Sequence, residues 1–146
     1  DAFSAYGTRL LPPGEDGLWQ AMTDERIKAV IPMAPEGAWL FGPRGLGSVD
    51  RKWVMVIGAT EDDLNIYNEE AVPIYGQLST PNRLMISFIG RHHMMIMDPD
   101  DVAIMTHFTV AFFGIHLQGR DDYGGYFSNN YISPARGLVL GIYTEK

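Results

Sequence analysis

Cysteine is absent from this 146-residue sequence, and basic residues are few. Without cysteine the chain forms no disulfide bond and no thiolate zinc site, although the redox compartment stays open. Eleven Lys and Arg against 18 Asp and Glu give a net charge of −7. Nucleic-acid backbones and anionic membrane surfaces are bound by clustered Lys and Arg, and here these residues are scattered. The composition therefore argues against nucleic acid and membrane as partners.

Long apolar runs, internal repeats and low-complexity tracts are also lacking. A membrane-spanning helix requires roughly 20 apolar residues in succession, and no run approaches that length. The chain length suits one ordinary domain with a core of its own. The first residue is Asp1 rather than Met, which we interpret as a sign of processing or of a fragment, and on that basis we expect a periplasmic or secreted location.

Apolar runs and helical patterns alternate along the chain. Buried strands are predicted over residues 27–35, 53–57 and 84–90. Helices are predicted over 66–78, with Pro73 as a defect, and over 100–117, with Asp100 as N-cap and Gly119 as the end. Residues 36–50 predict a long Gly-rich loop, and LVLGIY predicts one more short strand. This order is typical of an α/β protein with a parallel sheet, flanked by a connecting or lid segment (1–23) and a turn-rich tail (120–146).

Carboxylates follow one predicted strand and histidines follow the next. In WVMVIGATEDD, residues 53–63, an apolar strand leads straight to Glu61, Asp62 and Asp63, and His92 and His93 follow the strand over 84–90. Neighbouring parallel strands lie about 4.8 Å apart, so residues just past their ends face each other across one edge of the sheet. A carboxylate beside an imidazole fixes the tautomer and leaves Nε2 as a base toward a nucleophile.

Four runs together resemble a known family. DERIKAVIPMAP, VMVIGATEDD, LMISFIGRHH and THFTVAFFGIHLQG, which lie within residues 24–119, are similar to the C-terminal half of an α/β-hydrolase of the dienelactone-hydrolase-like group. The resemblance implies a serine ester hydrolase without a cofactor, with Asp62 as the acid and His92 as the base of a Ser-His-Asp triad. The loop before the acids is one residue longer than in that pattern and His93 adjoins His92, so Asp63 and His93 stay open as alternates.

The nucleophile expected from this resemblance is missing. Six serines occur, and none lies in the G-x-S-x-G elbow that exposes a nucleophile between a strand and a helix. We therefore expect a companion chain that carries G-x-S-x-G, as in a cleaved, two-chain hydrolase acting on a small or polymeric ester. Three parallel strands also leave a bare edge, and we expect the few predicted helices to leave part of the sheet uncovered, for that chain to complete.

Other interpretations of the same residues stay open. A non-catalytic α/β binding or scaffold module would keep the same outline without activity. His92 and His93 with Asp98, Asp100 or Asp101 would instead suit a zinc- or iron-dependent hydrolase. Trp39, in the Gly-rich segment, either lines a substrate pocket or packs in the core. No metal site is assigned to the favoured interpretation.

Overall fold

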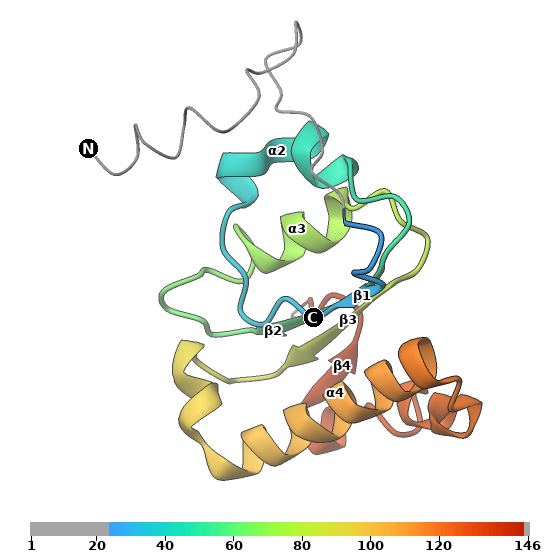
Figure 1. Ribbon diagram of the computed structural model, residues 1–146. Coiled ribbons are helices and arrows are strands. Elements are labelled where there is room, and N and C mark those ends of the chain that lie inside the picture. Colours follow the sequence, from blue (N-terminus) through green and yellow to red (C-terminus); the bar gives the residue numbers. More distant parts are fainter. Residues whose placement is uncertain (1–23, 145–146) are drawn as a thin grey trace, which may run out of the picture.

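A four-stranded mixed sheet forms the centre of the computed structural model, which describes residues 24–144 (Figure 1). The strand order is β1-β2-β3-β4. Strands β1 (Ala29–Val30), β2 (Trp53–Ala59) and β3 (Arg83–Phe88) are parallel, and β4 (Leu138–Leu140) runs antiparallel to β3. The protein is thus of the α/β type that was predicted, but LVLGIY contributes an antiparallel edge strand, so the sheet is mixed and not purely parallel.

Helices cover both faces of the sheet. Met55 and Ile57 of β2 share a buried cluster with Phe108 and Phe112 of α4 (Pro99–Gln118). Val54 and Val56 point the other way and pack with Ala71 of α3 (Ala71–Gln77), and α2 (Ala38–Gly47) lies on α3 (Figure 1). Burial on both sides explains why β2 is apolar without alternation. The expectation that the few helices would leave part of the sheet uncovered was therefore wrong for its faces.

Residues 36–50, which were predicted to be a loop, contain helix α2. The carboxylate of Glu70 accepts hydrogen bonds from the backbone N–H groups of Gly37 (2.8 Å) and Ala38 (2.7 Å), and so satisfies the start of the helix. Ala38 and Leu46 then pack against Ile74. The helix is kinked at Gly42 (φ 58°), just before Pro43. The prediction failed because the capping group and the packing partner both lie more than 25 residues away in sequence.

The other helices are shifted relative to the predicted bounds. Helix α3 begins at Ala71 rather than residue 66, so Pro73 falls in its first turn, where a missing N–H does no harm. Helix α4 is capped by Asp98, whose carboxylate accepts from the N–H groups of Asp100 (2.9 Å) and Asp101 (3.3 Å), and Asp100 is therefore not the N-cap. Gly119 ends α4 in the left-handed region (φ 69°), as predicted.

The first strand is shorter than predicted, yet its segment follows β2 for longer than two residues. Beyond Val30, the Ile57 N–H donates to Pro32 O (2.9 Å), and the Ala34 N–H donates to Ile57 O (2.8 Å). The tail also joins the main body. Its 3₁₀ segments η2 (Asp121–Phe127) and η3 (Pro134–Arg136) flank Ile132, which is buried in the same cluster as Phe108. Residues 120–144 therefore share the core of residues 24–119, while the expected segment 1–23 lies outside the described residues.

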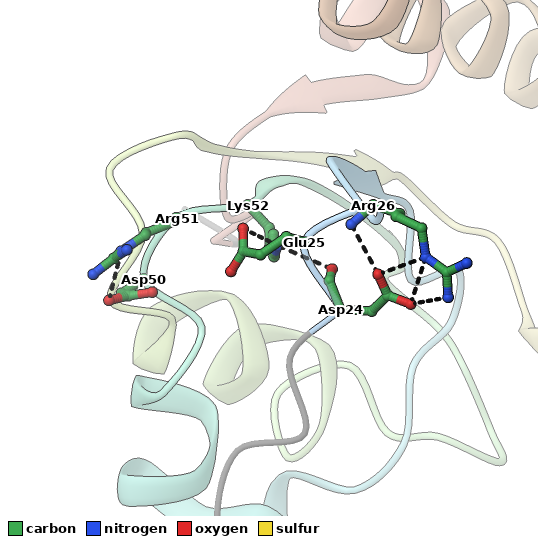
Figure 2. A network of polar contacts seen from close by, with 6 residues as sticks. All are labelled: Asp24, Glu25, Arg26, Asp50, Arg51 and Lys52. Atoms are coloured by element: carbon green, nitrogen blue, oxygen red, sulfur yellow. Dashed lines mark hydrogen bonds and ion pairs between the residues drawn. The ribbon is translucent and has the colours of Figure 1, made fainter.

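Charged side chains tie together the end of the sheet at which β1 and β2 begin (Figure 2). Asp24 and Arg26 form an ion pair, which holds the pKa of the Asp24 carboxyl below its usual range. Lys52 Nζ lies 3.3 Å from Asp24 O and 3.5 Å from a carboxylate oxygen of Glu25, so the entries to both strands are linked. The carboxylates and histidines that were predicted to carry chemistry lie at the other end of the sheet, after the last residues of β2 and β3.

Candidate functional site

The loops that follow β2 and β3 are hydrogen-bonded to each other. The Thr60 N–H donates to Phe88 O (3.0 Å), and the Glu61 N–H donates to Arg91 O (3.0 Å). Thr60 Oγ1 accepts from the Gly90 N–H (2.8 Å). The residues just past the two strands therefore lie side by side, as the parallel pairing predicted.

Asp62 and His93 form an acid–imidazole pair at this edge. His93 Nδ1 lies 3.2 Å from Asp62 Oδ1 and 3.1 Å from Oδ2. Only 2% of the Asp62 side chain is exposed. Its Oδ1 also accepts from the backbone N–H groups of Leu64 (3.0 Å) and Asn65 (2.8 Å). The turn after β2 therefore fixes the carboxylate, and the carboxylate in turn fixes the ring.

The Nε2 side of the His93 ring, which faces away from Asp62, is free of hydrogen bonds within residues 24–144. The side chain keeps 23% of its surface exposed, and Nε2 has no hydrogen-bond partner within residues 24–144. When Nδ1–H donates to Asp62, Nε2 carries a lone pair and is able to accept a proton. Asp62 then stabilises the imidazolium that forms. The pair has the arrangement that general-base catalysis requires.

His92, which was expected to meet Asp62, points elsewhere. Its Nδ1 donates to Glu61 O (2.8 Å), its Nε2 lies 3.6 Å from a Glu61 carboxylate oxygen, and 65% of the side chain is exposed. The reason is local backbone geometry, since His92 is extended (φ −93°, ψ 172°) whereas His93 begins the 3₁₀ segment η1 (His93–Met97). Asp63 is likewise exposed, beside the buried Asp62. The geometry joins Asp62 to His93, which was predicted only as an alternate to His92.

An ion pair behind His93 was not anticipated from the sequence. Arg91 Nε donates to a carboxylate oxygen of Asp101 at 2.7 Å. The Asp101 side chain is 3% exposed, whereas that of Arg91 is 50% exposed. The pair ties the loop before His93 to the first turn of α4. The run DPDD predicted capping at this turn, but nothing in it separates the buried Asp101 from its exposed neighbours.

The residues considered as metal ligands have other roles. Asp98 caps α4 and Asp101 pairs with Arg91. The two histidines of α4, which were not among these candidates, also have packing roles. His107 packs among tyrosine rings, and His116 stacks on Trp53 with ring centroids 3.8 Å apart. Within residues 24–144 no group of three His, Asp or Glu side chains is arranged to hold a metal ion. The structure thus gives no support to the metal-dependent alternative in this part of the chain.

No serine in the described part of the chain bonds to His93. Ser87 is fully buried and bonds to the Tyr67 hydroxyl (2.6 Å) and to Gly141 O (2.7 Å). Ser48 and Ser128 donate to backbone carbonyls of their own turns, and Ser4 lies outside the described residues. Within residues 24–144, the structure thus shows no serine paired with His93.

Two further features bear on a substrate. A hollow of about 410 Å³ opens next to the Asp62 loop, and Thr60, Glu61, Tyr67 and Tyr143 are among its lining residues. Trp39, the expected pocket residue, lies on α2 with 73% of its surface exposed. It is not a core residue, so the packing alternative for Trp39 does not hold.

The fold and the comparisons define the chain only broadly. A mixed sheet with helices on both faces is a general α/β arrangement. Comparison of the sequence with protein-family models and with curated proteins gives no match. None of the helices within residues 24–144 combines the length and the apolar character needed to cross a bilayer.

Proposed function

We propose that this chain supplies the acid and the histidine of a serine ester hydrolase of the α/β-hydrolase type. The observation that carries the proposal is the pairing of buried Asp62 with His93, whose Nε2 faces no partner in the described residues. The resemblance of residues 24–119 to dienelactone-hydrolase-like enzymes points to the same chemistry and the same order of acid before histidine. The geometry favours His93 over His92 as the base.

In this proposal the nucleophile is a serine of a companion chain. Its hydroxyl donates its proton to His93 Nε2 as its oxygen attacks the ester carbonyl. The imidazolium, stabilised by Asp62, returns that proton to the leaving alcohol, which leaves an acyl-serine. Water then attacks the acyl group and gives its proton to His93. The imidazolium passes that proton to the serine oxygen as the acid leaves, which restores the free serine and the neutral histidine. The cycle needs no cofactor.

Three features support a companion chain. No described serine is hydrogen-bonded to His93, and β1 hydrogen-bonds a strand on one side only within residues 24–144. A strand added at β1 would extend the sheet next to the Asp62–His93 edge, where parallel strands carry their catalytic groups. Trp39 is exposed and would line the ester pocket against the surface of that companion.

Ester hydrolysis by the native protein that contains this chain tests the assignment. His93→Ala should lower kcat on a p-nitrophenyl ester by about 10³-fold or more, and Asp62→Asn by a comparable factor, because the base or its correct tautomer is lost. His92→Ala is the matched control, an exposed histidine one position away, and should leave kcat within about twofold. Loss of activity in the His92 variant with retention in the His93 variant would reverse the assignment.

A further inference from the structure

A second hollow lies between α4 and the segment that carries η3 and β4. Its volume is about 360 Å³, and Ile104, Phe108 and Leu138 provide apolar walls. His107, Tyr131 and Arg136 complete the lining. Small-molecule sites have volumes of about 300–1,000 Å³ and combine apolar walls with a few polar groups. Neither Asp62 nor His93 lines this hollow, so it is separate from the proposed ester site.

Arg136 gives the hollow a positive charge that no carboxylate of residues 24–144 neutralises through a salt bridge. Its guanidinium lies over the Tyr131 ring, 4.6 Å from the centroid. Other arginines pair with aspartates, as Arg91 and Arg120 do, but no carboxylate of residues 24–144 forms a salt bridge with Arg136. In a chain of net charge −7, an exposed arginine without an acidic partner is available to an external anion.

His107, a lining residue of the same hollow, carries an unsatisfied polar atom. Its ring stacks on Tyr131 (centroids 5.4 Å apart, 19° between planes) and meets the edge of Tyr126 at 4.4 Å. Its Nε2 is buried and has no hydrogen-bond partner in the described part of the chain. Leaving a buried nitrogen unpaired costs free energy, which a ligand oxygen at this position would recover.

We propose that this hollow binds a small monocarboxylate with an apolar chain or ring. The apolar part lies against Ile104, Phe108 and Leu138. The carboxylate accepts hydrogen bonds from the Arg136 guanidinium, whose fork matches two carboxylate oxygens, and from His107 Nε2. The same positive charge disfavours amines, and the volume excludes large ligands.

Comparing the affinities of three ligands with the same alkyl tail distinguishes the contribution of the carboxylate charge from that of apolar burial. Octanoate, octanol and octylamine are titrated by calorimetry into the native protein that contains this chain, with methyl and aromatic NMR shifts used to place them. Octanoate should bind with a Kd of about 1 mM or tighter, octanol about tenfold more weakly, and octylamine more weakly still. The shifts should fall on Ile104, Leu138 and Tyr131.

Two variants test the roles of the polar groups. Arg136→Gln should lower the affinity for octanoate to that for octanol and leave octanol unchanged. His107→Phe keeps an aromatic ring but removes Nε2, and should weaken octanoate alone. Arg51→Gln, at the far end of the sheet, is the matched control and should change neither ligand.

The proposal is overturned by three results. These are no saturable octanoate binding, an unchanged octanoate preference in Arg136→Gln, or shifts confined to the His93 loop. None of these measurements involves turnover, so their failure is distinguishable from failure of the proposed ester hydrolysis.

Discussion

The Asp62 side chain is almost fully buried, and its carboxylate is held by two backbone N–H groups and one imidazole. A buried carboxylate is tolerated only when such partners replace its hydration. These contacts fix both oxygens in place, so the direction of the His93 ring is set before any substrate arrives. At the scale of single residues, preorganisation of this pair is what would favour the proposed ester hydrolysis.

Arg91 should matter to stability because it neutralises the buried Asp101. Arg91→Ala should lower the free energy of unfolding by about 1–3 kcal/mol, since it leaves the Asp101 carboxylate without its partner. Arg91→Lys should recover part of this loss. Urea denaturation measures the effect, with Arg51→Ala, a variant of an exposed arginine, as control. Equal stability of the two alanine variants would show that the ion pair contributes nothing.

His116 should make stability depend on pH. Its ring packs on Trp53 and Phe112, and burial lowers its pKa below the ordinary value of about 6.5. Above that value both the folded and the unfolded state hold a neutral ring, and the group contributes no pH dependence. As the pH falls below it, the unfolded state takes up the proton first, so the folded state loses relative stability.

His116→Phe keeps an aromatic ring and removes this titration. The variant should therefore gain stability relative to the native sequence as the pH is lowered from about 7.5 to about 5.5. Denaturant unfolding at both pH values checks this, with His92→Gln as the exposed control. A difference between native and His116→Phe protein that stays constant with pH would refute the role of His116.

The position of Asp62 at the sheet edge was predictable from the sequence, and the histidine that pairs with it was not. An apolar strand that ends in acidic residues predicts a carboxylate at the sheet edge, and the loop after the next strand predicts an imidazole beside it. Which of His92 and His93 turns inward depends on one backbone change, from the extended His92 to the 3₁₀ turn that begins at His93. Neighbouring residues in such a loop point in different directions, so the spacing in the sequence does not show which of the two histidines points toward Asp62.

At the scale of elements, α4 and η2 pack so closely that position 114 of α4 has no room for a side chain. A Cβ atom added to Gly114 would lie 2.7 Å from the Tyr123 ring. Gly76 in α3 has open space around the same position. Both glycines lie inside helices, where alanine is normally the more stable residue by about 1 kcal/mol.

Substitution of these two glycines by alanine should therefore change the free energy of unfolding in opposite directions. Gly76→Ala should raise the free energy of unfolding by up to about 1 kcal/mol, and Gly114→Ala should lower it by about 1–3 kcal/mol because Tyr123 must move. Thermal unfolding of both variants measures the contrast. Stabilisation by Gly114→Ala would show that η2 moves away from α4 at little cost.

Elements were predictable where their signals were local. Gly119 ends α4 and the apolar β2 is buried on both faces, and each is readable from the adjoining residues. Helix α2 was not predictable, because Glu70 caps it from another loop. The mixed character of the sheet was also missed, since the pairing of β4 with β3 joins segments about 50 residues apart.

At the scale of the whole molecule, the two faces of the sheet are filled, and the edge strands β1 and β4 each pair on one side only within residues 24–144. In the proposed hydrolase a companion chain would add strands beside β1 and bring a nucleophile, and it would not need to cover a face. Its joint with this chain should be apolar and extensive if the complex is permanent. A folded, inactive monomer that never associates with a second polypeptide would instead favour a binding or scaffold role.

Covalent labelling of the native protein tests the central claim most directly. A fluorophosphonate probe reacts with a serine that an adjacent base activates. Mass spectrometry of the labelled sample should place the probe on a G-x-S-x-G serine of the companion chain, with labelling lost in His93→Ala and kept in His92→Ala. Labelling of a serine within these 146 residues, or undiminished labelling in His93→Ala, would contradict the account.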